Sequence, residues 1–221
     1  MYSVKAIEEI DITSPDFHCD FLNIQALMEK GAPVSILFTD EEGEPSLHLF
    51  CELIQKARSG ESFLIKNQGC RVGAYVLGDT EKTPLDYYYG SKRYANLDAA
   101  RTATQNLYRI TTKGRSIKIA PFTGESADIL ILFLKPERAM RMIQAMSFIT
   151  GEPFEMRTGG IASICSDCTV YPLQGKIGIS LGCKGSRKHS KYGDDEVVVG
   201  IPFKLAKELD EALGKIPGTN D

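Results

Sequence analysis

The stretch "ADILILFLKPERAMRMIQAMSFITG" (residues 127–151) contains the most regular pattern in the chain. Its six consecutive apolar residues, 129–134, predict a strand that is buried on both faces. Pro136 then stands where proline favours the first turn of a helix, and Gly151 marks the end of that helix. A buried strand followed by a helix predicts a fold in which helices pack on β-sheet.

The rest of the chain contains patterns for further helices and strands. Apolar residues at helical spacing predict helices at 14–31 (with Ser14 as N-cap), 46–60, 96–110 and 203–214. Apolar or alternating runs predict strands at 33–38, 115–122, 177–181 and 196–202, a hairpin of 62–66 with 71–78, and short strands at 154–157, 161–165 and 169–171. The predicted class is α+β with mixed β-sheets.

Several short motifs recur in the second half of the chain in the same order, which indicates an internal duplication. The matched pairs are SILF (35–38) with LILF (130–133), GESF (60–63) with GEPF (151–154), and GSKR (90–93) with GSRK (185–188). The apolar stripes of two predicted helices also match, Phe50, Leu53, Ile54 and Ala57 with Met142, Ala145, Met146 and Ile149. We therefore expect two related α+β lobes, 1–125 and 126–221, with a ligand cleft where they meet. The alternative is one compact domain, with the matches arising by chance between ordinary α/β segments.

The composition is that of an ordinary globular protein and disfavours several functions. The chain has 221 residues and a formal net charge of −3, so it lacks the positive charge that attracts nucleic acid or anionic membranes. Its longest strongly apolar run, 129–134, is far shorter than the roughly 20 residues of a membrane-spanning helix. The acidic N-terminus carries no signal-peptide pattern. We expect a cytoplasmic protein without a membrane or nucleic-acid partner.

The six cysteines are the main candidates for chemistry. In a cytoplasmic protein they should be reduced, which leaves metal binding, redox chemistry or packing in the core. Cys165 and Cys168 form a C-x2-C pair, the spacing that gives two thiolates to zinc or to an iron–sulfur cluster. Cys183 follows across one predicted hairpin, and Cys70 comes after a glycine at a predicted strand start. The remaining two are expected to be packing residues of helices: Cys19 and Cys51.

A second candidate site is the basic stretch GSRKHSK (185–191). Arg187 and Lys188 are suited to binding a carboxylate or phosphate. The similar turn GSKRY (90–94) follows three tyrosines, so Arg93, Tyr87 and Tyr89 are expected to line a pocket for a small anionic or planar molecule, with the two tyrosines on one face of a strand. The alternative for 185–191 is a solvated loop, whose charges pair with the acidic residues 194–196. The alternative for the tyrosine cluster is an ordinary amphipathic sheet surface.

Much of the chain beyond about residue 30 resembles the archaeal and bacterial family known as domain of unknown function 169, or ArCR. The stretches that carry the resemblance are CELIQKARSGESF (51–63), GCRVGAYVLG (69–78), APFTGESADILILFLKPERAMRMIQA (120–145) and SLGCKGSRKHSKYGDDEVVVGIP (180–202). The resemblance implies no activity, because the family has none assigned. It implies that Cys70, Cys165, Cys183 and Arg187 occupy motif positions, whereas Cys168 is not placed. It therefore favours three separated thiols over the C-x2-C pair.

The leading hypothesis is a protein that binds zinc or an iron–sulfur cluster through Cys70, Cys165 and Cys183, with Cys168 as the fourth candidate and an anion site nearby. The alternative is a cofactor-free binder of a small anionic or planar molecule, whose cysteines are merely buried. A third is a subunit that binds no small ligand and acts through an exposed surface, and association with copies of itself is also open. The sequence contains no recognisable catalytic set, so it leaves open whether the protein is an enzyme.

Overall fold

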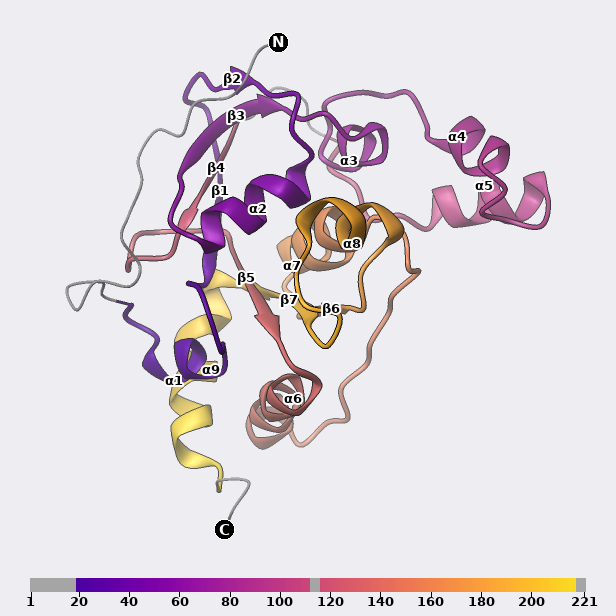
Figure 1. Cartoon of the computed structure of the whole chain (residues 1–221). Coiled ribbons are helices and arrows are strands. Elements are labelled where there is room, and N and C mark those ends of the chain that lie inside the picture. Colours follow the sequence, from indigo (N-terminus) through magenta and orange to yellow (C-terminus); the bar gives the residue numbers. More distant parts are fainter. Residues whose placement is uncertain (1–18, 112–115, 218–221) are drawn as a thin grey trace.

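The computed structural model describes residues 19–111 and 116–217, which contain a seven-stranded β-sheet (Figure 1). Its order is β2-β3-β4-β1-β5-β7-β6, in which β2 and β3 are parallel and the other neighbours are antiparallel. The strands are β1 Val34–Thr39, β2 Glu44–Pro45, β3 Phe63–Asn67, β4 Ser116–Pro121, β5 Ile129–Leu134, β6 Gly178–Ser180 and β7 Val197–Pro202. This mixed sheet, with helices on both faces, confirms the predicted α+β class.

Strand β5 lies inside the sheet, between β1 and β7, and all six of its residues are buried. Ile129, Ile131 and Phe133 belong to the apolar core on one face of the sheet. The alternate residues Leu130, Leu132 and Leu134 belong to the core on the other face. The continuous apolar run of the sequence is explained by this position, because both faces of the strand are covered.

The helices divide between the two faces. One core is formed with α1 Leu22–Ala26, α6 Pro136–Thr150 and α9 Phe203–Lys215. The other face carries a layer that includes α2 Phe50–Arg58, α3 Arg71–Val76, the π-helix η1 Ser163–Val170, α7 Tyr171–Leu173 and α8 Lys184–Ser190. Two further helices, α4 Leu85–Gly90 and α5 Leu97–Gln105, extend this layer away from the sheet (Figure 1). Within the described ranges, no helix combines the length and apolar character needed to cross a membrane.

The predicted helices at 46–60, 96–110 and 203–214 and the one after Pro136 are confirmed as α2, α5, α9 and α6. Asn96 caps α5 through its Oδ1, which accepts a hydrogen bond from the Ala99 N–H at 2.8 Å. Of the predicted helix 14–31, the structure describes α1, whereas Ser14 lies outside the described residues. The predicted strands at 33–38, 115–122, 177–181 and 196–202 are confirmed as β1, β4, β6 and β7, and 62–66 as β3.

Several predicted strands are wrong. Residues 71–78, predicted as the second strand of a hairpin, contain α3 instead, because Gln68 hydrogen-bonds both the N–H and the carbonyl of Cys70 and turns the chain. The stretch around Tyr87 and Tyr89 is helix α4. The segments 161–165 and 169–171 belong largely to η1, and 154–157 has no regular structure. Their β-branched, aromatic and sulfur side chains favour strands locally, but packing against neighbours overrides that preference.

The structure does not confirm the internal duplication. The proposed repeat pairs β1 with β5 and α2 with α6, and the two strands are antiparallel neighbours. A two-fold axis between antiparallel neighbours would place both helices on the same face of the sheet. Instead α2 packs on one face and α6 on the other. Strands from 1–125 and from 126–221 thus form one continuous sheet without a repeated arrangement of helices.

Candidate functional site

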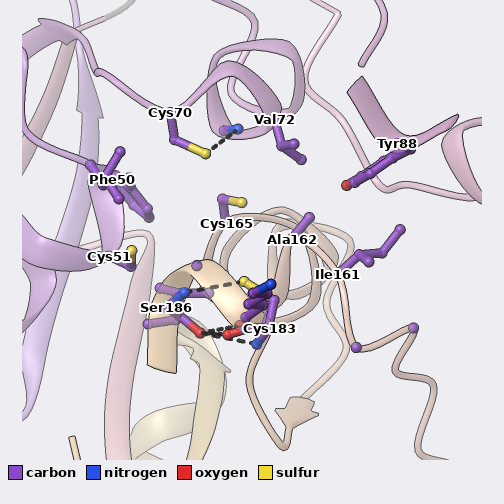
Figure 2. A pocket seen from close by; sticks show the side chains of 18 of the residues that line it. Phe50, Cys51, Cys70, Val72, Tyr88, Ile161, Ala162, Cys165, Cys183 and Ser186 are labelled. Carbon is purple, nitrogen blue, oxygen red and sulfur yellow. Dashed lines mark hydrogen bonds between the residues drawn. The ribbon is translucent and has the colours of Figure 1, made fainter. Parts of the chain in front are cut away.

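A cavity of about 390 Å³ lies among α2, α3, η1 and α8. Residues at the beginning of each of these helices form part of its wall. Each helix contributes one cysteine to the wall, either from its first turn or from its N-cap (Figure 2). These residues are Cys51, Cys70, Cys165 and Cys183. Four segments that are far apart in the sequence therefore bring four thiols to one space.

Two of the sulfurs accept hydrogen bonds from backbone N–H groups. Cys70 is the N-cap of α3, and its Sγ accepts from the Gly73 N–H at 3.5 Å. Cys183 is the N-cap of α8, and its Sγ accepts from the Ser186 N–H at 3.3 Å. Ser186 in turn accepts from the Cys183 N–H at 3.0 Å through its Oγ. Donors of this kind favour the thiolate form of a cysteine.

The thiols differ in how readily they ionise. Burial would raise the pKa of Cys183, but hydrogen bonds from Ser186 and Ser163 outweigh it and lower the pKa below its ordinary value. Burial raises the pKa of Cys51 to about 12. Burial, together with the neighbouring cysteines 70, 183 and 51, raises the pKa of Cys165 well above its ordinary value. Without a bound cation, these two thiols are therefore expected to be neutral.

Hydrogen-bond donors and positive charge dominate the polar part of the wall. Gly73 and Ser186, whose N–H groups donate to the sulfurs of Cys70 and Cys183, both line the cavity. Arg93 and Lys184 also line it, whereas none of the described lining residues carries a carboxylate. The remainder is largely apolar or aromatic, with residues such as Val72, Ile161 and Tyr88. Among the described lining residues, the charged side chains are therefore all positive.

Cys168, the second member of the C-x2-C pair, does not line the cavity. Its Sγ is directed to the sheet, where it contacts the carbonyl oxygens of Val198 at 3.4 Å and Gly178 at 3.8 Å. The pair lies within the π-helix, so the two side chains leave the helix in different directions. Among the described residues, no three His, Cys, Asp or Glu side chains are placed to hold a single metal ion.

The predicted anion-binding residues are divided between the cavity and the surface. Tyr87 and Arg93 line the cavity, and the guanidinium of Arg93 lies 4.6 Å from the centre of the Tyr87 ring. Tyr89 is 51% exposed, and Lys188 is also exposed. Arg187 donates hydrogen bonds to the carbonyls of residues 181, 193 and 196, and so holds the chain around α8 together.

The sequence interpretation missed two residues of the wall, Cys51 and Tyr88. The sequence predicts Cys51 to be a packing residue of its helix, although its position at the start of α2, outside the apolar stripe, distinguishes it from the core residues. Tyr88 is 2% exposed, and its hydroxyl has no hydrogen-bond partner among the described residues. In the predicted strand Tyr87 and Tyr89 would share one face and Tyr88 the other. In the helix α4, Tyr87 and Tyr88 both line the cavity and Tyr89 is exposed.

A second cavity of about 270 Å³ adjoins the first and shares Tyr94, Gly159 and Ile161 with it. Asp167 of η1 lines this second cavity and is buried. Its Oδ2 accepts hydrogen bonds from Thr158 at 3.0 Å and Ser180 at 3.1 Å. Burial raises the pKa of Asp167 to about 7, although these hydrogen bonds and the nearby Arg157 act in the opposite direction.

The raised pKa of Asp167 predicts a pH dependence of stability. The unfolded chain releases this proton near pH 4, whereas the folded protein keeps it until about pH 7. The protonated carboxyl of Asp167 therefore makes its full contribution to the stability of the folded state below about pH 4, and this contribution is lost as the pH rises to about 7. We expect the free energy of unfolding of wild type, relative to Asp167→Asn, to fall across this range in urea titrations. Parallel curves for the two proteins would contradict this assignment.

The fold and the site define an α+β protein with a cavity lined by four cysteines. The family model of the uncharacterised ArCR proteins, domain of unknown function 169, matches residues 24–212. The chain belongs to this family, as the resemblance in its sequence predicts. An uncharacterised protein of Methanocaldococcus jannaschii is 29% identical over 175 residues, which cover 74% of this chain and 75% of that protein. No solved structure gives a significant match.

Proposed function

We propose that the protein binds an iron–sulfur cluster in the cysteine-lined cavity. The observation that carries this proposal is that four separate helices each bring one thiol to the same cavity wall. The ligands would be Cys51, Cys70, Cys165 and Cys183. The fourth ligand is thus Cys51 and not Cys168, which the C-x2-C spacing indicates.

The donor set fits a cluster better than a single zinc ion. Iron–sulfur clusters are held by four cysteine thiolates, which are shared among more than one iron atom. The ligands of a cluster can therefore lie farther apart than the four ligands of one zinc ion. Among the described residues no three such side chains form a single-ion site, so a single zinc ion is not proposed.

The charge of the wall also supports a cluster. A cluster with four thiolates is anionic, and the wall offers Arg93, Lys184 and no carboxylate among its described residues. The N–H groups of Gly73 and Ser186 already donate to two of the sulfurs. Hydrogen bonds to ligating sulfurs stabilise a cluster and set its reduction potential. The high pKa values of Cys51 and Cys165 mean that bound iron would have to displace their protons.

The test is anaerobic reconstitution of the full chain with iron and sulfide. We expect about two or four iron atoms per chain with an equal amount of acid-labile sulfide, visible absorption and an EPR signal after reduction. Cys165→Ala should lose most of the bound iron. Cys168→Ala, three residues along the same helix, is the matched control and should keep it. Circular dichroism establishes that both variants are folded.

Two results would contradict the proposal. The first is iron well below one equivalent in the folded wild-type protein, with or without bound zinc. The second is equal loss of iron in Cys165→Ala and Cys168→Ala, because only Cys165 lines the cavity. Either result would favour the alternative, a cofactor-free cavity whose cysteines serve as packing residues.

A further inference from the structure

We infer that the aromatic end of the same cavity, lined by Tyr87, Tyr88 and Tyr94, is a binding site for a small organic carboxylate. The Tyr88 hydroxyl and Arg93 are its recognition groups. This inference goes beyond the proposed cluster, because it depends on residues that do not belong to the cysteine set. If a cluster occupies the cysteine end, the carboxylate would lie beside it.

The first observation is the unpaired hydroxyl of Tyr88. The side chain is 2% exposed, and its Oη has no hydrogen-bond partner among the described residues. A buried polar group without a partner is costly, and native proteins nearly always satisfy such groups. Figure 2 shows the hydroxyl directed into the cavity, toward the side that carries Cys70 and Cys165. A ligand in the cavity would supply the missing acceptor.

The second observation is the charge at this end. The guanidinium of Arg93 lies over the Tyr87 ring and donates to Ser91 Oγ at 2.8 Å. Arg93 lines the cavity, and no carboxylate is found among the described residues of its lining. The phenol can donate a hydrogen bond to the same group that the guanidinium binds, and the positive charge of Arg93 favours an oxyanion over a cation or a neutral amide.

The third observation concerns the body of the ligand. Tyr88 packs edge to face on Tyr94, with ring centres 5.7 Å apart, and lies 5.8 Å from the Tyr87 ring. Val72 and Ile161 complete this part of the wall. Aromatic and aliphatic walls with a few placed polar groups are typical of sites for small organic molecules. The expected ligand is therefore an apolar or planar molecule with one carboxylate, rather than an inorganic anion.

Binding of benzoate and acetate, with benzamide as the neutral analogue of benzoate, tests this inference. Calorimetry and ligand-observed NMR would use the full chain, both unloaded and reconstituted with iron and sulfide. We expect benzoate to bind at least tenfold more tightly than benzamide. Tyr88→Phe should weaken benzoate binding about tenfold or more, because it removes only the hydroxyl. Tyr89→Phe, the exposed neighbour on α4, should leave binding unchanged.

A second measurement separates a ligand contact from a structural role. Without ligand, Tyr88→Phe should raise the melting temperature, because the variant no longer buries an unpaired hydroxyl. The inference is overturned if the folded protein binds neither carboxylate, if benzoate and benzamide bind equally, or if Tyr88→Phe binds benzoate like wild type. If the protein takes up iron but binds no carboxylate, the carboxylate site is overturned and the cluster proposal stands. Carboxylate binding without iron uptake overturns the cluster alone.

Discussion

Replacement of Glu196 by glutamine is expected to lower the free energy of unfolding by about 3–5 kcal/mol, because it leaves a buried guanidinium without its counter-charge. Arg58 is 1% exposed and Glu196 is 5% exposed. Two hydrogen bonds join them, from Nη1 to Oε2 at 3.1 Å and from Nη2 to Oε1 at 2.5 Å. The Arg58 guanidinium also lies 4.6 Å from the centre of the Phe133 ring on β5.

This ion pair has consequences for the candidate site. Arg58 ends α2, whereas Glu196 precedes β7 and accepts a hydrogen bond from the Gly193 N–H at 2.7 Å. Arg187 of α8 donates to the carbonyls of both Gly193 and Glu196. The pair therefore connects the helix that carries Cys51 to the segment that follows the helix of Cys183. Loss of the pair should loosen two walls of the cavity.

Glu61→Gln is a matched control, because Glu61 pairs with another cation of α2, Lys56, at the surface. That partly exposed pair should contribute at most about 1 kcal/mol. Urea denaturation monitored by circular dichroism measures both variants. The double replacement Arg58→Met with Glu196→Leu should recover much of the lost stability, because it removes both buried charges. Equal effects of Glu196→Gln and Glu61→Gln would contradict the assignment.

Gly200→Ala is expected to destabilise the protein by about 3 kcal/mol or more, because η1 lies directly on the backbone of β7. A Cβ at position 200 would lie 1.9 Å from the carbonyl oxygen of Cys168 and 2.5 Å from its carbonyl carbon. Both atoms belong to the main chain of a buried π-helix, so a side-chain rotation cannot relieve the clash. The helix would have to move away from the sheet and carry Cys165 with it.

Gly90→Ala is the control for this substitution. Gly90 ends α4, and a Cβ there would meet nothing within 4 Å. Because alanine favours a helix more than glycine does, this variant should be neutral or slightly more stable. Thermal unfolding of the two variants, with iron content after reconstitution, measures stability and site together. A melting temperature of Gly200→Ala close to that of wild type would mean that η1 can shift without cost.

Prediction from the sequence succeeded where local pattern and burial agree. The apolar run of β5, the proline that begins α6 and the Asn96 cap of α5 are local signals, and each was placed correctly. Prediction failed for η1, whose cysteine- and β-branched-rich sequence is typical of a buried strand. A π-helix is stable there because the glycines of β6 and β7 allow its backbone to approach the sheet closely. Those glycines, Gly178 and Gly200, lie outside the segment that they accommodate, which ends at Val170.

The same distinction applies to the candidate site. Cys70, Cys165 and Cys183 were grouped from the sequence, and the structure brings these three side chains to one cavity. Cys168 was grouped with them by its spacing, yet its sulfur points to the sheet. Cys51 could not be added, because its approach depends on how α2 packs beside α8.

The sequence by itself determined the α+β class, the central buried strand, the family and three of the four cysteines of the cavity. Periodicity and short motifs are local properties, so they are visible along the chain. Only the tertiary structure decided which thiols share a space, which tyrosine has an unpaired hydroxyl, and that Arg187 supports the fold around α8. These features depend on the direction of side chains from helices distant in sequence, and the packing of the helices on the sheet sets that direction.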